Sequence, residues 1–348
     1  MFRRIISSIL IIAFSFSLTS CGRTEKERYE AQFLELFDTV TQIVAYTDSK
    51  EEFTKQSQLI YDTLKEYHQL YDIYNDYPGI NNIKTINDNA GKKPVKVDKK
   101  IIDLLLFAKK GYINTEGKLN VALGAVLKIW HEHREAGIED EAVATLPDIG
   151  ELKEANKHTD INKVIISEVD STVFLEDPKM SLDVGGVGKG YATEQVCQYA
   201  EKNGFTSGLL SVGGNVRAIG SKGTEEELWN VGIQNPDKES QQKMLGITYL
   251  KDMSLVSSGI YERYYIVGGK QYHHIIDPET LFPADHYAQV TILTKDSGQA
   301  DATAKAAFIL PFDKALGYIN KQPDVEAMWV FKDGSIKYSD GFKNYLKK

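Results

Sequence analysis

Apolar side chains recur at helical spacing in three parts of the chain. They form one stripe along residues 56–74 and a shorter one along 100–110, and each stripe predicts an amphipathic helix. Residues 75–79 and Gly111 are expected to end these two helices, because turn-forming residues and glycine interrupt helical patterns. A third helix is predicted over residues 191–202.

Strand patterns are shorter and alternate with a period of two. Residues 37–46 (FDTVTQIVAY) predict a first strand, and residues 229–236 (WNVGIQNP) predict another. Paired runs separated by turn residues predict hairpins over 162–176 and over 207–220, where two glycines form the second turn. A last hairpin is expected to turn at residues 333–334.

The clearest hairpin is YERYYIVGGKQYHHIIDP, in which two aromatic-rich runs flank Gly268 and Gly269. Two glycines suit the left-handed conformations that a two-residue hairpin turn needs. Counting outward from this turn places Arg263 opposite His274. Antiparallel hairpins with interspersed helices predict an α+β fold, with mixed and largely antiparallel sheets and flanking helices, rather than a doubly wound parallel sheet.

Composition is that of an ordinary globular protein. The 348 residues are 42% hydrophobic and 26% charged, and this length suits one large domain or two closely packed ones. The formal net charge is -8 and the chain has no long run of Lys and Arg, which disfavours a general nucleic-acid-binding role. A small anionic ligand remains compatible, because the charge of a binding site is local.

The first residues have the pattern of an export signal. Arg3 and Arg4 precede an apolar run over residues 5–18 that is too short to span a membrane. The following Leu-Thr-Ser-Cys sequence, ending at Cys21, resembles the lipobox of bacterial lipoproteins. We therefore expect Cys21 to be lipidated and the protein to be anchored in the cell membrane at its extracytoplasmic face.

These signals divide the chain into three parts. We expect a lipoprotein signal peptide over residues 1–20, a lipidated tether over 21–32 and one domain over 33–348. The other cysteine of the chain, Cys197, then has no disulfide partner. It lies in an apolar helical pattern, where a buried and unreactive thiol is expected.

A glycine-rich stretch, SLDVGGVGKGYA, occupies residues 181–192. Two common phosphate motifs do not fit it: a P-loop needs Ser or Thr after its lysine, whereas Gly190 follows Lys189, and the glycine spacing is not that of a dinucleotide-binding fingerprint. Free amides at a helix N-terminus would still suit a phosphate, and open carbonyl groups would suit a cation. A tight strand-to-helix turn is the structural alternative.

His131 and His133 are the other candidates for metal binding. They lie two residues apart, a spacing that brings both side chains to one face only in a strand. Zinc sites need three or four protein ligands, and the neighbouring Glu132 would point away. We therefore expect surface histidines here.

Several short motifs follow one another in order along the chain. They are FDT from Phe37, LNVALG from Leu119, DVGGVGKGYA from Asp183, SVGGN from Ser211, SGIYERY from Ser258, HIIDPET from His274 and ADA from Ala300. Each motif alone is weak, but the ordered set resembles the ApbE-type FAD:protein FMN transferases, from about residue 37 to about residue 310.

The resemblance implies an ApbE-like, T-fold-related architecture and a reaction. Such enzymes bind FAD and magnesium, cleave the pyrophosphate, and join FMN through its phosphate to a Thr or Ser hydroxyl of a target flavoprotein, releasing AMP. By position, the Gly186 carbonyl and the Asp301 carboxylate would hold Mg²⁺. The residues implied to contact FAD are Phe37, Tyr74, Asn120, Val121 and Ala122 on a strand, Asp183, Lys189 and Ile275.

His274 aligns with the histidine that the family has before Ile-Asp-Pro, which implies a catalytic role beside Asp301. An imidazole can accept a proton near neutral pH or hold the phosphate. The alternative is a structural histidine that aligns the hairpin with Asp277. Asp277 itself, followed by Pro278, is expected to form a turn.

The chain departs from the family pattern at two positions. Where the family typically has Asp-Ala-x-x-Thr, with the Thr hydroxyl on the metal, this chain ends the motif with Lys305. Lys305 is expected to pair with Asp301 four residues earlier and to supply positive charge at the pyrophosphate, weakening or replacing the metal. In the alternative, Thr303 or a water completes the coordination and Lys305 swings aside. Leu281 stands where the family usually has Gly, which alters a turn.

Three functions are therefore compared. The leading hypothesis is a membrane-anchored transferase that attaches FMN to extracytoplasmic flavoproteins with an FMN-binding domain. The second is a hydrolase that splits FAD into FMN and AMP. The third is a non-catalytic flavin-binding lipoprotein, which Lys305 alone favours.

Overall fold

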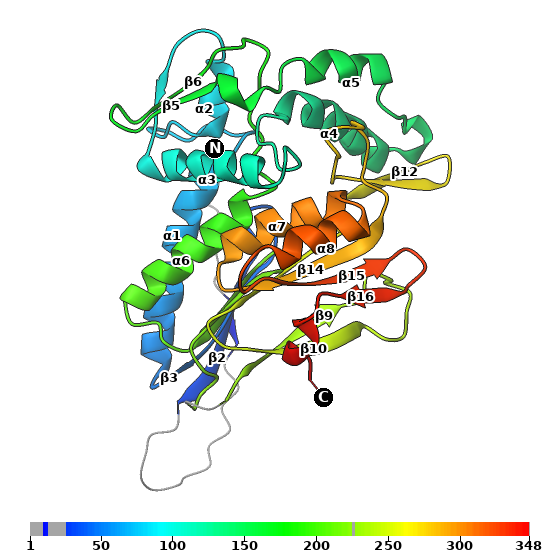
Figure 1. The fold of residues 1–348 in the computed structure, drawn as a ribbon. Helices are drawn as coiled ribbons and strands as arrows, with labels where there is room; N and C mark the ends of the chain where they lie inside the picture. Colours follow the sequence, from blue (N-terminus) through cyan, green and yellow to red (C-terminus); the bar gives the residue numbers. More distant parts are fainter. Residues whose placement is uncertain (1–9, 13–25, 225–226, 348) are drawn as a thin grey trace, which may run out of the picture.

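An antiparallel sheet of nine strands forms the centre of the protein. The structure, a computed structural model, describes residues 10–12, 26–224 and 227–347. The strands follow one another in the order β1 (Leu10–Ile12), β2 (Glu27–Phe33), β3 (Thr41–Thr47), β7 (Gly208–Val212), β8 (Asn215–Ile219), β11 (Ser254–Gly259), β14 (Tyr287–Thr294), β15 (Glu326–Phe331) and β16 (Ile336–Tyr338) (Figure 1).

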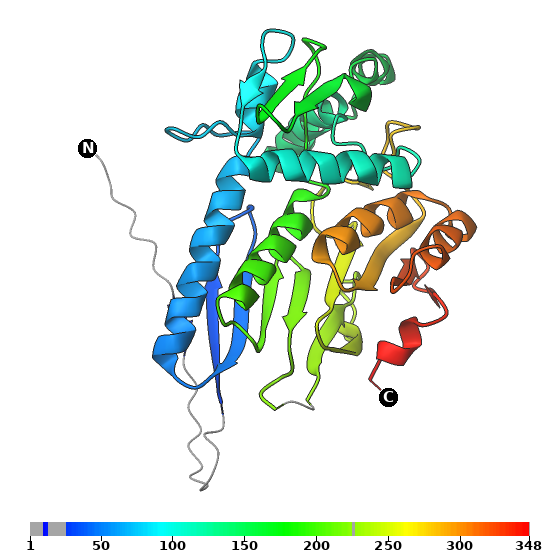
Figure 2. The same cartoon turned by 60° about the vertical axis from the view of Figure 1, so that its left-hand side comes forward.

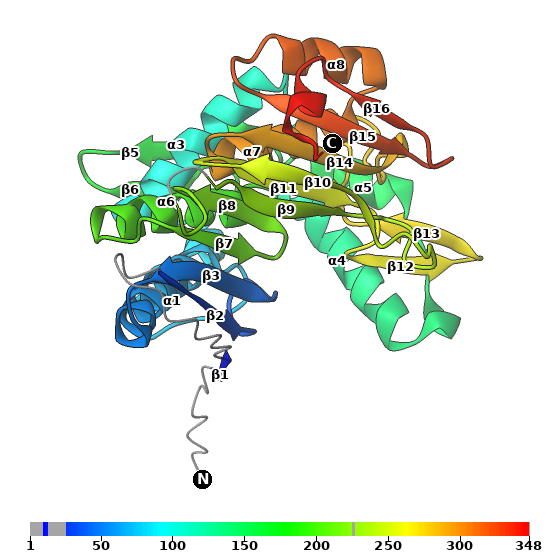
Figure 3. The ribbon, with the colours of Figure 1, turned by 90° about the horizontal axis from the view of Figure 1, so that it is seen from below.

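Both faces of this sheet are covered. One face carries the helices α1 (Lys50–Tyr71), α6 (Gly188–Lys202), α7 (Ser297–Ile309) and α8 (Phe312–Asn320) (Figure 2). On the other face, the hairpin of β9 (Trp229–Gln234) and β10 (Met244–Leu250) packs through its apolar side chains (Figure 3). In β9, Trp229, Val231 and Ile233 are buried while the residues between them are exposed, which is the period of two expected for a strand packed on one side.

A smaller group of elements lies beyond one end of the sheet, at the top of Figure 1. Its elements are α2 (Ile83–Asp88), β4 (Val95–Lys96), α3 (Lys99–Asn114), α4 (Gly124–Glu139), α5 (Ile149–Asn156), β5 (Val164–Ser167), β6 (Thr172–Leu175), β12 (Tyr264–Val267) and β13 (Lys270–His273). Short 3₁₀ turns cover Glu141–Val143 and Ile161–Lys163 in this group. A third covers Phe342–Tyr345, near the C-terminal end of the chain. Strands β12 and β13 pack against α4, and the Tyr265 hydroxyl donates to the carbonyl of Thr145, in the segment that follows α4, at 3.1 Å.

The structure confirms the α+β fold and the hairpins that turn residues predicted. Strands β5 and β6 pair antiparallel, as do β7 with β8 and β15 with β16. Gly268 and Gly269 both adopt positive φ, at 57° and 77°. The register predicted from that turn is also correct, because the His274 amide donates to the Arg263 carbonyl at 3.1 Å.

Two predictions near the N-terminal end of the domain are wrong. The first strand was expected over residues 37–46, but β3 begins at Thr41, and Phe37 and Asp38 lie in a turn with φ of 56° and 51°. The tether was expected to reach residue 32, but β2 begins at Glu27. The physical reason is the alternation in β2, which places Tyr29 and Ala31 against the helices.

Other element boundaries also differ. Helix α3 continues through Gly111, whose missing side chain makes room for Leu119. Helix α1 ends before residue 74, because the Asp72 carboxylate accepts hydrogen bonds from the amides of Tyr74 and Asn75 and closes the chain into a turn. Residues 120–122, expected in a strand, form a turn before α4.

Cys197 is buried in α6, as predicted, with 1% of its surface exposed. Burial raises the pKa of its thiol well above the usual value, against the opposing effect of Arg217. Cys21 and most of the expected signal peptide lie outside the described residues. Among the helices of the described residues, none is long and apolar enough to cross a membrane.

Candidate active site

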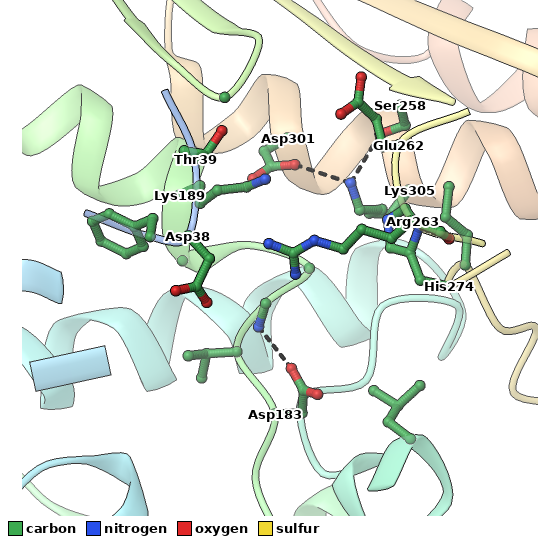
Figure 4. A pocket seen from close by; sticks show the side chains of 18 of the residues that line it. Asp38, Thr39, Asp183, Lys189, Ser258, Glu262, Arg263, His274, Asp301 and Lys305 are labelled. Carbon is green, nitrogen blue, oxygen red and sulfur yellow. Dashed lines mark hydrogen bonds and ion pairs between the residues drawn. The ribbon is translucent and has the colours of Figure 1, made fainter. Parts of the chain in front are cut away.

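A cavity of about 570 Å³ lies where the end of the sheet meets the smaller group of elements. Its walls come from the C-terminal end of α1, the N-terminus of α6, and parts of α4, α7 and the segment around β12 and β13 (Figure 4). This size falls within the range of about 300–1,000 Å³ typical of ligand pockets. The predicted site residues that line it are Phe37, Tyr74, Asn120, Val121, Asp183, Gly186, Lys189, His274, Ile275, Asp301 and Lys305.

Ala122 is the exception among the predicted residues. Its side chain is fully buried and does not line the cavity. Its amide donates to the side-chain oxygen of Asn120 at 2.9 Å, and the Asn120 side-chain nitrogen donates to the Thr159 carbonyl at 3.0 Å. Ala122 therefore supports the turn that presents Asn120 and Val121 to the cavity.

The glycine-rich stretch forms the entry into α6 and part of the cavity wall. None of its glycines adopts a positive φ, so a left-handed turn does not explain them. Gly190 is required by close approach instead: a Cβ there would lie 2.4 Å from the Asp301 Cβ and 2.6 Å from the Ser297 carbonyl oxygen. Gly186 has only Leu119 within 4 Å of its Cβ position, and it borders the open cavity.

Asp301 connects this stretch to α7. The side chain is almost fully buried, and one carboxylate oxygen accepts from the Gly190 amide at 3.0 Å and from the Asn215 side chain at 3.3 Å. The other oxygen lies 3.3 Å from the Lys305 ammonium, which also donates to the Ser258 hydroxyl at 2.9 Å. The predicted pairing of Lys305 with Asp301 is therefore confirmed.

Positive groups converge on the space beside Asp301. Figure 4 shows the ammonium groups of Lys189 and Lys305 and the guanidinium of Arg263 reaching into it from three different segments. Burial lowers the pKa of Lys189 to about 8, a shift that Asp301 opposes and that the neighbouring Lys305 increases. Such a cluster of cations around one carboxylate is suited to an anion with more than one charge.

His274 lies at the edge of this cluster in its neutral form. Its Nδ1 is 3.2 Å from the Arg263 carbonyl oxygen, which can only accept, so Nδ1 carries the proton and Nε2 keeps a free lone pair. Burial lowers the pKa of His274 well below the usual value, and the charges of Lys305 and other nearby cations lower it further. The neighbouring His273 differs, because it donates to the Ala284 carbonyl and accepts from the Ile275 amide, both within the protein.

Asp183 lies below Lys189 and Arg263 in the view of Figure 4, on the glycine-rich stretch that leads into α6. Its carboxylate accepts from the Gly185 amide at 2.8 Å (Figure 4). Burial raises the pKa of this carboxyl, and the hydrogen bond from Gly185 offsets part of that rise. The Asp183 amide also donates to the Val121 carbonyl at 2.8 Å, which joins two of the predicted binding segments.

Asp277 forms the predicted turn and does not bond to His274. Its carbonyl accepts from the Leu281 amide at 2.8 Å, and its carboxylate pairs with Lys118 at 3.0 Å. Leu281 adopts a φ of 62°, so this chain keeps the left-handed turn with a leucine in it. The buried Leu281 side chain packs in a cluster with Trp130, whose indole donates to the Leu281 carbonyl at 2.9 Å.

Several cavity residues were missed at the level of sequence. The sequence patterns predict no role for Arg263 or His68, yet both line the cavity. His131 was expected at the surface, but it lies in α4 and its ring contacts Tyr74 at a centroid distance of 5.1 Å. The aromatic spacing of α1 predicted core packing, which obscured the cavity-facing histidine at position 68.

The oxygens around Asp301 do not fit a magnesium ion in their present arrangement. Both carboxylate oxygens already accept hydrogen bonds, and the Lys305 ammonium occupies the neighbourhood in which a cation would bind. Thr303, the alternative ligand, is buried and lies beside Tyr318 of α8. Across residues 10–12, 26–224 and 227–347, no three His, Cys, Asp or Glu side chains form a group that could hold a metal.

Comparison with known proteins identifies the family. The family model described as "ApbE family" matches residues 37–329. A protein named FAD:protein FMN transferase from Treponema pallidum is 34% identical over 282 residues, covering 76% of this chain and 75% of its own length. A protein of the same name from Klebsiella pneumoniae is 30% identical over 273 residues, covering 77% and 82%.

Solved structures agree with this assignment. The crystal structure of an ApbE protein from Thermotoga maritima is 27% identical, with a TM-score of 0.80, and the match covers 92% of this chain and all of that one. A flavin transferase ApbE from Vibrio cholerae, 21% identical, shares the fold with a TM-score of 0.75 over 92% of this chain. This chain therefore belongs to the ApbE family.

Proposed function

We propose that this protein is an FAD:protein FMN transferase. The observation that carries the proposal is the convergence of Lys189, Lys305 and Arg263 in one cavity with the neutral His274. Phosphoryl transfer depends on neutralising the phosphates, positioning the reactants and removing a proton from the attacking hydroxyl. The cation cluster meets the first need, and the free Nε2 of His274 meets the last.

In this reaction a Thr or Ser hydroxyl of the acceptor protein attacks the phosphorus atom of the FMN half of FAD. The new bond joins the hydroxyl oxygen to that phosphorus, the bond from the same phosphorus to the bridging oxygen breaks, and AMP leaves. Lys189, Lys305 and Arg263 stabilise the negative charge on the phosphate oxygens. His274 takes the hydroxyl proton at Nε2, because its Nδ1 proton is held by the Arg263 carbonyl.

Lys305 provides the positive charge that the family resemblance assigns to Mg²⁺. It is fixed by two contacts, to Asp301 and to Ser258, and its side chain is only 17% exposed. Residues Gly186 and Asp301 could still hold a magnesium ion if Lys305 moved away, so the two arrangements make different predictions about metal binding.

Replacing Lys305 with Thr should increase the affinity for Mg²⁺ at least tenfold. The substitution removes the ammonium that competes for the Asp301 oxygen and adds a hydroxyl oxygen, which Mg²⁺ prefers. Calorimetric titration of Mg²⁺ into wild type and Lys305→Thr measures the difference. Equal affinity in both proteins would eliminate the idea that Lys305 takes the place of the metal.

FAD binding should weaken as the pH rises above about 8. Below that pH the Lys189 side chain is already a charged ammonium. Above it the side chain is a neutral amine, which must take up a proton before the phosphate can bind. The fall in affinity should approach about tenfold per pH unit. Titration of FAD at pH 7 to 9.5 checks this, and Lys189→Arg should remove most of the pH dependence; an unchanged slope in that variant would contradict the role of Lys189.

The test of the function itself separates the three hypotheses. The protein is incubated with FAD, with and without Mg²⁺, and with a flavoprotein domain as acceptor. Flavin fluorescence that stays with the denatured acceptor, together with released AMP, indicates transfer. Free FMN and AMP indicate hydrolysis, and FAD binding without AMP release indicates a non-catalytic flavin-binding protein.

We also propose that lipidation of Cys21 anchors the protein at the extracytoplasmic face of the cell membrane. The support is the basic start, the short apolar run and the lipobox-like sequence that ends at Cys21. Such an anchor would bring the enzyme to acceptor flavoproteins outside the cytoplasm. Metabolic labelling with a fatty acid, lost in Cys21→Ser, is the direct test.

A further inference from the structure

The turn at Phe37 and Asp38 is a strained segment in the cavity wall. Both residues line the cavity and both adopt a left-handed conformation, with φ of 56° and 51°. This conformation costs roughly 1–2 kcal/mol for each residue that is not glycine. Strained backbone at a binding site persists only where its surroundings hold it in place.

His68 on α1 holds this turn. The Phe37 amide donates to the His68 Nδ1 at 3.2 Å, and the two rings contact each other edge to face at 5.5 Å. Because Nδ1 accepts, the proton of a neutral imidazole must be on Nε2. Nε2 lies 3.3 Å from the Tyr77 hydroxyl, which itself donates to the Asp72 carboxylate at 2.7 Å.

The same carboxylate holds a second cavity residue. Its other oxygen accepts from the Tyr74 amide at 2.6 Å. Burial alone would raise the pKa of Asp72, but the hydrogen bonds from Asn75, the Tyr74 amide and Tyr77 together lower it. One hydrogen-bonded chain, Asp72–Tyr77–His68, therefore fixes the backbone of both Phe37 and Tyr74.

We propose that His68 is a positioning residue for FAD, holding the Phe37–Asp38 turn in the shape that accepts a ring of the dinucleotide. The inference rests on the proposed function, which supplies FAD as the ligand. Phe37 and Tyr74 are aromatic walls of the cavity, and aromatic rings stack well on planar heterocycles. Because the turn is already ordered before FAD binds, no binding free energy is lost in ordering it.

Two substitutions distinguish positioning from a general structural role. His68→Leu removes the acceptor for the Phe37 amide, and we expect FAD to bind about tenfold more weakly. His68→Asn places an oxygen near the position of Nδ1 and should keep the FAD affinity within about threefold of wild type. At saturating FAD, the turnover of both variants should stay within about twofold of wild type, because the change affects binding rather than the reacting groups.

His158→Leu is the matched control. His158 also bonds to a buried carboxylate, Asp177, at 2.9 Å, but neither residue lines the cavity. This variant should lose thermal stability without a change in the Kd for FAD. A loss of FAD affinity in His158→Leu equal to that in His68→Leu would overturn the proposal, as would unchanged affinity in His68→Leu or equal impairment of His68→Asn.

Hydrogen exchange at the Phe37 amide, measured in the absence of FAD, tests whether His68 holds this amide in a hydrogen bond. We expect slow exchange in wild type and His68→Asn and fast exchange in His68→Leu. Equal exchange in all three proteins would refute the idea that His68 holds the Phe37 amide. If wild type binds FAD but transfers no FMN, the transferase proposal fails while the positioning role stands. If wild type does not bind FAD, both the transferase proposal and the role in FAD binding are refuted.

Discussion

Lys305→Met is expected to slow FMN transfer by about 100- to 1,000-fold at saturating FAD. The reason is the loss of one preorganised positive group beside the phosphates, and removing a single such group from an enclosed site typically costs this much. Methionine fills nearly the same volume, so the shape of the cavity is largely kept. AMP release under single-turnover conditions measures the effect.

The control is Lys295→Met, on the loop just before α7. Lys295 is largely exposed, pairs with Asp324 at 2.9 Å and does not line the cavity. Its replacement should leave transfer unchanged. Lys305→Arg keeps the positive charge and should retain more activity than Lys305→Met. Wild-type turnover by folded Lys305→Met would show that the Lys305 charge is not used in the reaction.

Gly190→Ala is expected to destabilise the protein by about 3 kcal/mol, at the upper end of the usual cost of overpacking. The added Cβ would meet the Ser297 carbonyl at 2.6 Å, and the backbone there cannot turn aside as a flexible side chain can. Helix α6 would have to move away from α7, which also breaks the bond from the Gly190 amide to Asp301. Chemical denaturation measures the free energy of unfolding.

Gly317→Ala is the matched substitution, because Gly317 lies inside α8 with nothing within 4 Å of its Cβ position. There alanine should stabilise the protein by about 0.5–1 kcal/mol through its higher helix propensity. A loss of stability in Gly190→Ala no larger than about 0.5 kcal/mol would mean that α6 and α7 separate easily.

Local chemistry predicted much of this fold. Paired glycines at 268–269 and 213–214 and the Asp-Gly pair at 333–334 specified their hairpins, because few residues tolerate the conformations that these turns need. The boundaries that failed depended on distant contacts. Gly111 continues α3 because Leu119 packs where a side chain would be, and no local pattern reveals such a contact.

The residues of the candidate site were also predicted only in part. Most of the residues that the ordered motifs singled out line one cavity, and helical spacing alone predicted the pair of Asp301 and Lys305. His68 could not be predicted, because its partner Phe37 lies 31 residues away and reaches it only through a turn that β-propensity misassigned as strand. Tertiary contacts overrode local preference at this point.

The burial of Cys197 has a practical consequence. A thiol with a raised pKa and only 1% of its surface exposed is protected from alkylation and oxidation while the protein is folded, even in an oxidising compartment. Because it lies in α6, which lines the cavity at its first turn, its labelling by a thiol reagent would report how often that helix detaches from the sheet. The rate of Cys197 labelling, compared with and without a ligand, would therefore measure how much the ligand stabilises the active site.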